Sequence, residues 1–261
     1  MSGLANYNPK KWLNLKVFAI LTALGWLSFL AGIPYILALL KAPPPPMPMW
    51  IILPIVGIQG LVQMALFVGV GLWLGNKVRL GAPVLQAWLA GDPGALPLFR
   101  ALLPLALSGG VVVAAIILVL DKVVFALWLP DALLPRSSPS PWLGFLGSFY
   151  GGIAEELLLR LGLMTLLVWV GTKITRSKHF SSAVIWIAIA LTALLFGALH
   201  LPTTAQLVPL TAIVVTRALL LNGIPGLLFG WLYWRKGLEA AMVAHFSCDI
   251  VLHVIAVALS V

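Results

Sequence analysis

The chain has 261 residues, of which 62% are hydrophobic and only 9% are charged, and its mean hydropathy is +1.09. Soluble domains are about 45 to 50% apolar and about 25% charged, so this composition excludes an ordinary water-soluble protein and indicates an integral membrane protein. Sixteen Lys and Arg against seven Asp and Glu give a net charge of +9. No basic run, zinc-ligand pattern or interleaving of aromatic with basic residues accompanies this charge, so we expect no nucleic-acid partner. The single cysteine, Cys248, excludes an intrachain disulfide.

Apolar stretches of about 20 residues, the length that crosses the hydrocarbon core, recur along the chain. The first contains Pro34, where we expect a kink, and ends at Lys41 and the run Pro43 to Pro46. It is too long for a signal-peptide core and has no small-residue cleavage site, so we expect it to remain as a helix. The predicted spans are Val17–Leu40, Trp50–Gly75, Ala101–Leu120, Trp142–Val170, Ser182–Leu199, Ala218–Trp234 and Leu238–Leu259.

The segments between these spans are rich in turn formers. Leu80 to Arg100 is predicted to be a loop with a short interfacial helix around Leu85 to Leu89, and Asp121 to Pro141 an exposed connection with an amphipathic piece at Val123 to Leu129. Four glycines predict that the start of the fourth span is irregular: Gly144, Gly147, Gly151 and Gly152.

Residues 201–234 could hold one crossing or two short ones. Cytoplasmic segments carry an excess of Lys and Arg. If Lys10, Lys11 and Lys16 are cytoplasmic, the basic residues of 76–100 and 173–178 are also inside. Arg235 and Lys236 join them only if 201–234 crosses once. We therefore expect an all-α polytopic bundle of about seven to eight transmembrane helices in the cell membrane, with a cytoplasmic N-terminus. A short helix or re-entrant piece with Pro202 and Pro209 precedes the sixth span.

A charged side chain at the bilayer centre costs about 2.5 to 3.5 kcal/mol on the insertion scale and indicates function. Glu155 and Glu156 lie deep in the fourth span, and Arg160 follows Glu156 by one helical turn, so these two can pair. Glu155 is rotated by roughly 100° from its neighbour, lacks that local partner and is a candidate general base for water. The alternative is a buried polar clamp that fixes helix packing.

Two histidines complete the candidate set. His200 ends the fifth span, and Phe196, one turn earlier, can pack beneath its imidazole. His245 and Asp249 share one face of the last span, which suits a carboxylate that orients an imidazole, or two ligands of one ion. The alternatives are an interfacial cap for His200 and a satisfied core pair for the other two residues.

The other ionisable residues are expected at boundaries. Arg217 is interpreted as an end-of-helix or interface residue, His253 as interfacial, and Cys248 as packing. The remaining acids are expected in loops or at span ends: Asp92, Asp121, Asp131 and Glu239. Intramembrane serine-protease, zinc-peptidase His-Glu-Xaa-Xaa-His and paired-aspartate motifs are absent.

Three motifs, Glu-Glu-Xaa-Xaa-Xaa-Arg at 155–160, Phe-Xaa-Xaa-Xaa-His at 196–200 and His-Xaa-Xaa-Xaa-Asp at 245–249, resemble in order and spacing the signature of the CAAX prenyl endopeptidase and bacteriocin-processing (CPBP, or Abi) intramembrane proteases. The likeness covers about 145–260 and includes Gly-Trp-Leu-Tyr at 230–233. It implies a helical membrane endopeptidase with catalytic core 142–261, preceded by helices and loops in 1–141, that acts on a peptide or protein substrate, prenylated or membrane-embedded.

The resemblance also implies roles for the candidate residues. Glu155 would activate water with His200, and His245 with Asp249 would support the oxyanion. Where family members are described as metalloproteases, a divalent ion such as zinc would be held by Glu155, His200, His245 and Asp249. A metal-free route is equally open. The family often has Asn where this chain has Asp249, which puts a neutral amide donor in doubt.

One geometric conflict and two alternatives accompany this hypothesis. His200 lies about 18 residues into its span and His245 about 8 into its own, so in upright helices their depths differ by roughly 15 Å. They meet only if a helix is tilted or a boundary is misplaced. The alternatives are an ion- or proton-coupled transporter that uses the acidic residues, and a non-catalytic scaffold or immunity protein on the same fold.

Overall fold

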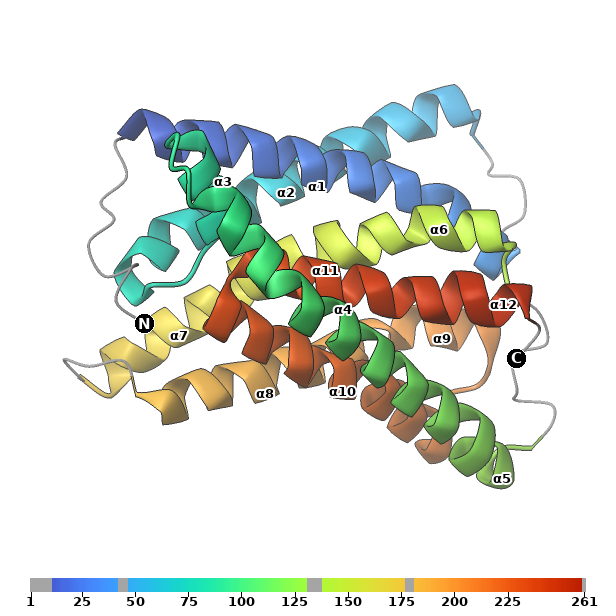
Figure 1. The fold of residues 1–261 in the computed structure, drawn as a ribbon. Coiled ribbons are helices and arrows are strands. Elements are labelled where there is room, and N and C mark those ends of the chain that lie inside the picture. The colour runs from blue at the N-terminus through green and yellow to red at the C-terminus, as the bar shows by residue number, and fades with distance from the viewer. Residues whose placement is uncertain (1–10, 42–46, 131–137, 177–180, 260–261) are drawn as a thin grey trace.

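The computed structural model describes residues 11–41, 47–130, 138–176 and 181–259, which form a helical bundle without strands in these ranges (Figure 1). Seven helical stretches are long and apolar enough to cross a membrane, and the prediction of an all-α polytopic bundle is confirmed. They are Leu15–Leu40, Met49–Val78, Ala95–Trp128, Pro141–Ile174, Ser182–Leu207, Ala212–Lys236 and Leu238–Ala258. Predictions for Lys10, Pro43 to Pro46, Asp131 and Lys178 concern residues outside the described ranges.

The elements follow one another with short connections. In Figure 1, α1 lies along the top, and α2 slopes behind it from the upper right toward the left. The span containing α11 lies in the middle, the span containing α6 and α7 slopes from the right of the middle to the lower left, α8 and α10 lie below, and α4 crosses in front. The helices are α1 (Lys11–Leu40), α2 (Met49–Val78), α3 (Pro83–Leu89), α4 (Ala95–Val119), α5 (Ala126–Trp128), α6 (Pro141–Phe149), α7 (Thr165–Ile174), α8 (Ser182–Leu199), α9 (Leu201–Leu207), α10 (Ala212–Lys236), α11 (Leu238–Asp249) and α12 (Ala256–Ala258). Four π-helical segments join them: η1 (Leu120–Phe125), η3 (Tyr150–Glu155), η4 (Leu157–Met164) and η5 (Ile250–Ile255).

Small residues let the spans approach closely, as expected where lipid supplies no hydrophobic force between helices. A side chain at Gly71 of α2 would collide with the backbone of Leu161 in η4, and one at Gly110 of α4 would collide with the backbone of Ala244 in α11. The central core is therefore packed around the two spans, η3–η4 and α11, that carry the acidic and histidine motifs.

Most predicted spans agree with the structure. The fifth coincides with α8, and a single crossing follows the short helix α9, which contains Pro202. The short helix predicted around Leu85 to Leu89 is α3, but the predicted loop ends earlier than Arg100, because α4 already begins at Ala95. The sixth span begins earlier than predicted, at Ala212, because Thr211 caps α10 by accepting from the Val214 backbone N–H. The glycine-rich start of the fourth span is irregular as predicted, since it passes from α6 into the π-helical segments η3 and η4.

The prediction of an exposed connection from Asp121 onwards is wrong for residues 121–128. The helix of α4 continues through η1 and α5 to Trp128. Asp121 stays in this helix because its Oδ1 lies 2.6 Å from Nε of Arg217 in α10. Arg217 is thus a partner in an interhelical ion pair, which goes beyond the end-of-helix or interface role expected from the sequence. Phe125 and Leu129 pack against Val214 beside the pair.

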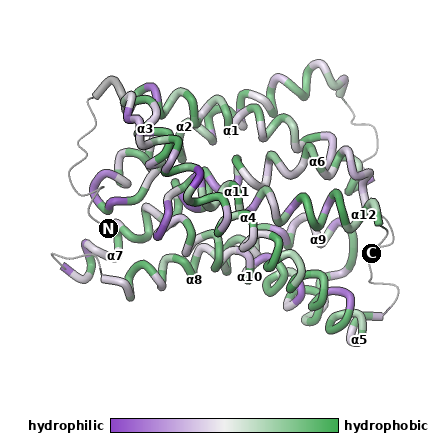
Figure 2. Tube along the Cα trace, in the orientation of Figure 1, coloured by the Kyte–Doolittle hydropathy of each residue, from purple (hydrophilic) through white to green (hydrophobic). Residues whose placement is uncertain are grey.

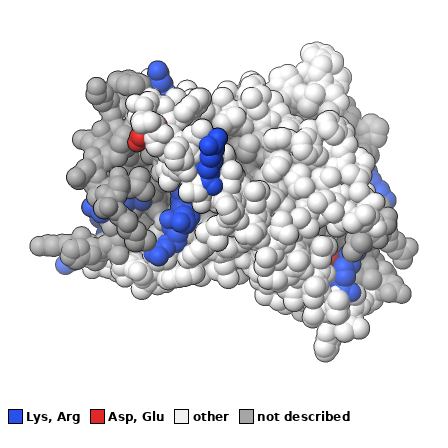
Figure 3. Space-filling model, viewed as in Figure 1, with Lys and Arg blue, Asp and Glu red and all other residues white. Residues whose placement is uncertain are grey.

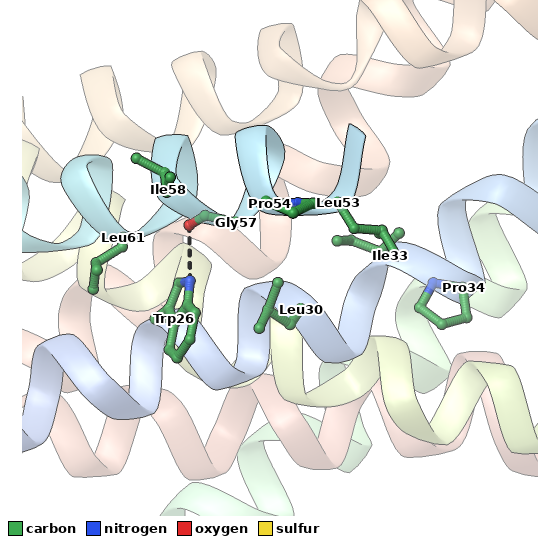
Figure 4. A pocket seen from close by; sticks show the side chains of 9 residues that line it. All are labelled: Trp26, Leu30, Ile33, Pro34, Leu53, Pro54, Gly57, Ile58 and Leu61. Carbon is green, nitrogen blue, oxygen red and sulfur yellow. Dashed lines mark hydrogen bonds between the residues drawn. The ribbon is translucent and has the colours of Figure 1, made fainter. Parts of the chain in front are cut away.

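Hydrophobic residues follow the chain along the length of the bundle (Figure 2), and its hydrophilic stretches lie chiefly toward the ends. Between α1 and α2 lies an apolar groove of about 480 Å³ (Figure 4), in which the indole N–H of Trp26 donates to the Gly57 carbonyl at 2.8 Å. None of the candidate site residues lines this groove, whose side chains belong to Trp26, Leu30, Ile33, Pro34, Leu53, Pro54, Gly57, Ile58 and Leu61.

Candidate active site

A buried glutamate and a histidine from two spans meet in the middle of the bundle. Glu156 follows η3, and its Oε1 lies 2.8 Å from Nδ1 of His245 in α11. The Glu156 side chain is fully buried and that of His245 is 6% exposed. The contact joins residues 89 positions apart, which the sequence motifs alone do not show.

Arg160 of η4 is the ionic partner of Glu156, as the spacing predicts. Its Nε lies 3.4 Å from Glu156 Oε2, and neither side chain is exposed. Its Nη2 donates to the Gly226 carbonyl of α10 at 3.2 Å, while Nε and Nη1 make no hydrogen bond. The guanidinium carbon lies 5.2 Å from the ring centre of Phe196 and 5.6 Å from that of Phe229. Cation–π contacts with two aromatic rings therefore add to the stabilisation of a buried cation that has only one hydrogen bond.

Two more carboxyl groups face the other nitrogen of the His245 ring. Nε2 lies 3.8 Å from Oε2 of Glu155 and 3.6 Å from Oδ1 of Asp249. The Glu155 side chain is 17% exposed and that of Asp249 is 12% exposed. Glycine is required nearby, because a side chain at Gly151 would collide with Asp249 Oδ2 and lie 3.1 Å from the same Nε2. One imidazole thus contacts three carboxyl groups.

Aromatic rings fix the plane of the His245 imidazole. Phe229 of α10 stacks on it with ring centres 4.4 Å apart at an angle of 21°. Phe196 of α8 meets it edge-on, at 5.6 Å and 78°. Phe229 is fully buried and was not among the candidates, although it directly precedes Gly-Trp-Leu-Tyr at 230–233.

His200 lies on the other side of Phe196, as the four-residue spacing predicts. The two rings are 5.0 Å apart at 80°. Nδ1 of His200 lies 2.8 Å from the Phe196 carbonyl. Since a carbonyl only accepts, Nδ1 carries the proton, and in the neutral ring Nε2 is left as the acceptor. Both histidines contact one phenylalanine ring, which resolves the apparent conflict in depth.

The remaining predictions about ionisable residues have mixed outcomes. Cys248 is buried in the hydrophobic core, as expected. His253 is more than an interfacial residue, since its Nδ1 lies 3.2 Å from the hydroxyl of Tyr35 in α1. Glu239 lies at the start of the last span, as expected, and its Oε1 accepts from the Leu85 backbone N–H of α3 at 2.8 Å. The partners of His253 and Glu239 are more than 100 residues away in the sequence, so the residues around each side chain do not predict these contacts.

The donor set implied for a metal does not assemble in this arrangement. Within the described ranges, no three His, Cys, Asp or Glu side chains are placed so that they could hold a metal ion. Nδ1 of His245 is engaged by Glu156 and Nδ1 of His200 by a backbone carbonyl. The side-chain placement therefore does not fit a zinc site held by Glu155, His200, His245 and Asp249.

Comparison with known protein families gives a match over residues 137–251, to the family described as "Type II CAAX prenyl endopeptidase Rce1-like". The matched range contains all three motifs, and it confirms the resemblance inferred from them. Separate comparisons with curated proteins and with solved structures found no match.

Proposed function

Since residues 137–251 of this chain match the family described as type II CAAX prenyl endopeptidase Rce1-like, we propose that the protein is an intramembrane endopeptidase that hydrolyses a peptide bond of a membrane-associated protein substrate by activating water. One observation carries this proposal: the partly exposed Glu155 and the buried Glu156–Arg160 pair meet at opposite nitrogens of His245. The residues that make these contacts lie in the proposed catalytic core 142–261. Residues 1–141 support it, because α1 packs along η3 and its Tyr35 contacts His253.

In this proposal Glu155 is the general base, and His200 assists it. A general base must reach water, and the Glu155 side chain is 17% exposed, whereas Glu156 is fully buried and occupied by two partners. The acceptor Nε2 of His200 can receive a proton during the reaction or hold the attacking water. The substrate carbonyl would then lie between His200 and His245, beside the ring of Phe196.

Glu156 and Arg160 act as positioning residues. A carboxylate that holds one imidazole nitrogen fixes the ring and leaves the other nitrogen for the reaction, as in the triads of other hydrolases. Here Glu156 holds Nδ1 of His245, and Nε2 remains toward Glu155 and Asp249. Arg160 balances the charge of Glu156 inside the bundle.

His245 is proposed as the donor to the oxyanion that forms when water adds to the substrate carbonyl. Because Nδ1 donates to the Glu156 carboxylate, Nε2 can donate to the oxyanion only when the ring is the doubly protonated imidazolium. Asp249 lies beside the same nitrogen. A carboxyl group donates a hydrogen bond only when it is protonated, so Asp249 would assist as a neutral acid, in the way that Asn does without titration.

The charge distribution supports a cytoplasmic N-terminus and an inner-face assignment for one end of the bundle. Blue side chains gather over the left half of Figure 3. The spans that end or begin at this end carry Lys77, Arg79, Lys173, Arg176, Arg235 and Lys236. We propose that this end faces the cytoplasm, in agreement with the positive-inside rule.

Cleavage by purified protein in liposomes tests the proposal, with a fluorescent prenylated CAAX peptide and an unprenylated peptide of the same sequence as probes. Glu155→Gln and His200→Ala are expected to lower kcat/KM at least about 100-fold, because each removes a proton-transfer group. His253→Ala is the matched control, since it removes a partly buried histidine outside the proposed machinery. Cleavage that survives in either site variant would overturn the assignment and favour the transporter or scaffold alternatives.

A further inference from the structure

A five-residue pattern, Trp-Xaa-Gly-Xaa-Lys, ends two separate spans. It is Trp-Leu-Gly-Asn-Lys at 73–77, at the end of α2, and Trp-Val-Gly-Thr-Lys at 169–173, at the end of α7. These two helices pack against each other and run in the same direction, so both copies lie at one end of the bundle (Figure 1). The pattern lies outside the candidate active site, and none of the three protease motifs includes it.

The two lysines converge on a single indole. Lys77 Nζ lies 3.7 Å from the ring centre of Trp73 and 5.8 Å from that of Trp169. Lys173 Nζ lies 5.9 Å from the ring centre of Trp169. Both ammonium groups belong to exposed residues, and in the described part of the chain neither forms an ion pair with a carboxylate. Two uncompensated cations therefore share one aromatic platform at a span end.

This arrangement has the chemistry of a phospholipid headgroup site. Tryptophans at the ends of spans lie at the level of the headgroups, and basic pockets between helices on the cytoplasmic side bind anionic headgroups. A phosphodiester oxygen can accept from each ammonium, and the half-buried Trp169 ring and the exposed Trp73 ring would then lie beside the glycerol and the upper acyl chain of such a lipid. Each cation would then have a counter-charge.

We propose that Lys77 and Lys173, with the rings of Trp73 and Trp169, bind the phosphate of an anionic phospholipid in the leaflet at this end of the bundle. A bound phosphate would bridge α2 and α7. The span that ends in α7 also carries Glu155 and Glu156, and α2 packs on η4 of that span. The lipid would therefore stabilise the packing of the span that carries both glutamates, whatever reaction the site catalyses.

The test uses the full chain in a neutral detergent with added phosphatidylglycerol or with phosphatidylcholine of the same acyl chains. The readouts are lipid adducts in native mass spectrometry and the midpoint of thermal unfolding. Lys77→Gln/Lys173→Gln is expected to weaken phosphatidylglycerol binding about 25-fold, since a basic residue at the surface contributes about fivefold. Arg235→Gln/Lys236→Gln removes the same charge from the same end of the bundle and is expected to retain binding.

Comparison of these variants distinguishes binding at this site from a general attraction between anionic lipid and the basic end of the bundle. Selective binding of phosphatidylglycerol that is lost in the Lys77/Lys173 variant, kept in the Arg235/Lys236 variant and kept in Lys77→Arg/Lys173→Arg supports the proposal. Equal loss in both glutamine variants, or unchanged binding in the Lys77/Lys173 variant, overturns it. Stabilisation by inorganic phosphate to the same degree would overturn the assignment to a lipid.

Discussion

Replacing Glu156 by Gln is expected to unfold the protein at markedly lower temperature, because it leaves a buried cation without a counter-charge. Both side chains of the Glu156–Arg160 pair are fully buried, and the guanidinium has one ionic partner at 3.4 Å and one hydrogen bond, to the Gly226 carbonyl. Two of its nitrogens, Nε and Nη1, make no hydrogen bond. Because neither side chain is exposed, solvent does not screen the charge that remains.

The cost can be estimated from the burial. Removing one partner of a fully buried ion pair destabilises by about 3–5 kcal/mol, against a total stability of about 5–15 kcal/mol. For a chain of this size that loss lowers the unfolding midpoint by on the order of 10 °C. Replacing the cation as well, in Glu156→Gln/Arg160→Met, removes the uncompensated charge and is expected to recover about 2 kcal/mol relative to additive single variants.

Thermal or denaturant unfolding of the four proteins in one detergent measures this coupling. Arg160→Met alone is expected to destabilise as well, because it leaves the Glu156 carboxylate buried with His245 as its remaining partner. The account of this pair as mutually dependent buried charges would be refuted by either of two results. One is a loss of unfolding free energy in the double variant equal to the sum of the losses in the two single variants, and the other is an unfolding midpoint of Glu156→Gln equal to that of the wild type.

Three further predictions follow from individual contacts. Gly151→Ala is expected to lower kcat/KM by about 100-fold, since the added methyl displaces the carboxyl of Asp249. Gly223→Ala is the control and should cleave at the wild-type rate, because its added methyl would lie 3.7 Å from the nearest atom of another residue; equal cleavage rates in the two variants would contradict the geometry. Asp249→Asn is expected to retain or raise kcat/KM and Asp249→Ala to lower it by about 10²–10³-fold, and loss of activity in the Asn variant would show that the carboxylate itself is needed. Asp121→Asn and Arg217→Gln are each expected to cost about 1 kcal/mol in unfolding experiments, because the pair is 20–22% exposed, and a double variant much less stable than either single one would argue against their coupling.

The sequence predicts the spans well because the hydrocarbon core imposes a length and a composition on every helix that crosses it. It predicts the candidate cluster less directly, since Glu155, His200 and His245 stand out only as costly residues in apolar surroundings. The meeting of the two histidines at Phe196 depends on how α8 and α11 cross, which upright helices do not reproduce.

The prediction of a loop at Asp121 fails for the converse reason. An isolated acid in hydrocarbon is costly, so the sequence favours placing it in water. Arg217, the residue that makes its burial tolerable, lies 96 positions further on. The contact of His253 with Tyr35 and the stacking of Phe229 on His245 also join residues of different spans, so the local sequence does not predict them.

The π-helical segments on either side of Glu156 also restrict how the length of this span can change. A π-helical turn holds an extra residue compared with an α-helical turn, and such turns occupy Tyr150–Glu155 and Leu157–Met164. Deleting one residue from either segment would let the backbone relax to the narrower helix and rotate everything beyond it. Glu155 and Glu156 would then no longer reach opposite edges of one imidazole. Insertions and deletions that preserve activity should therefore be found in the connections of this protein and not between Tyr150 and Met164.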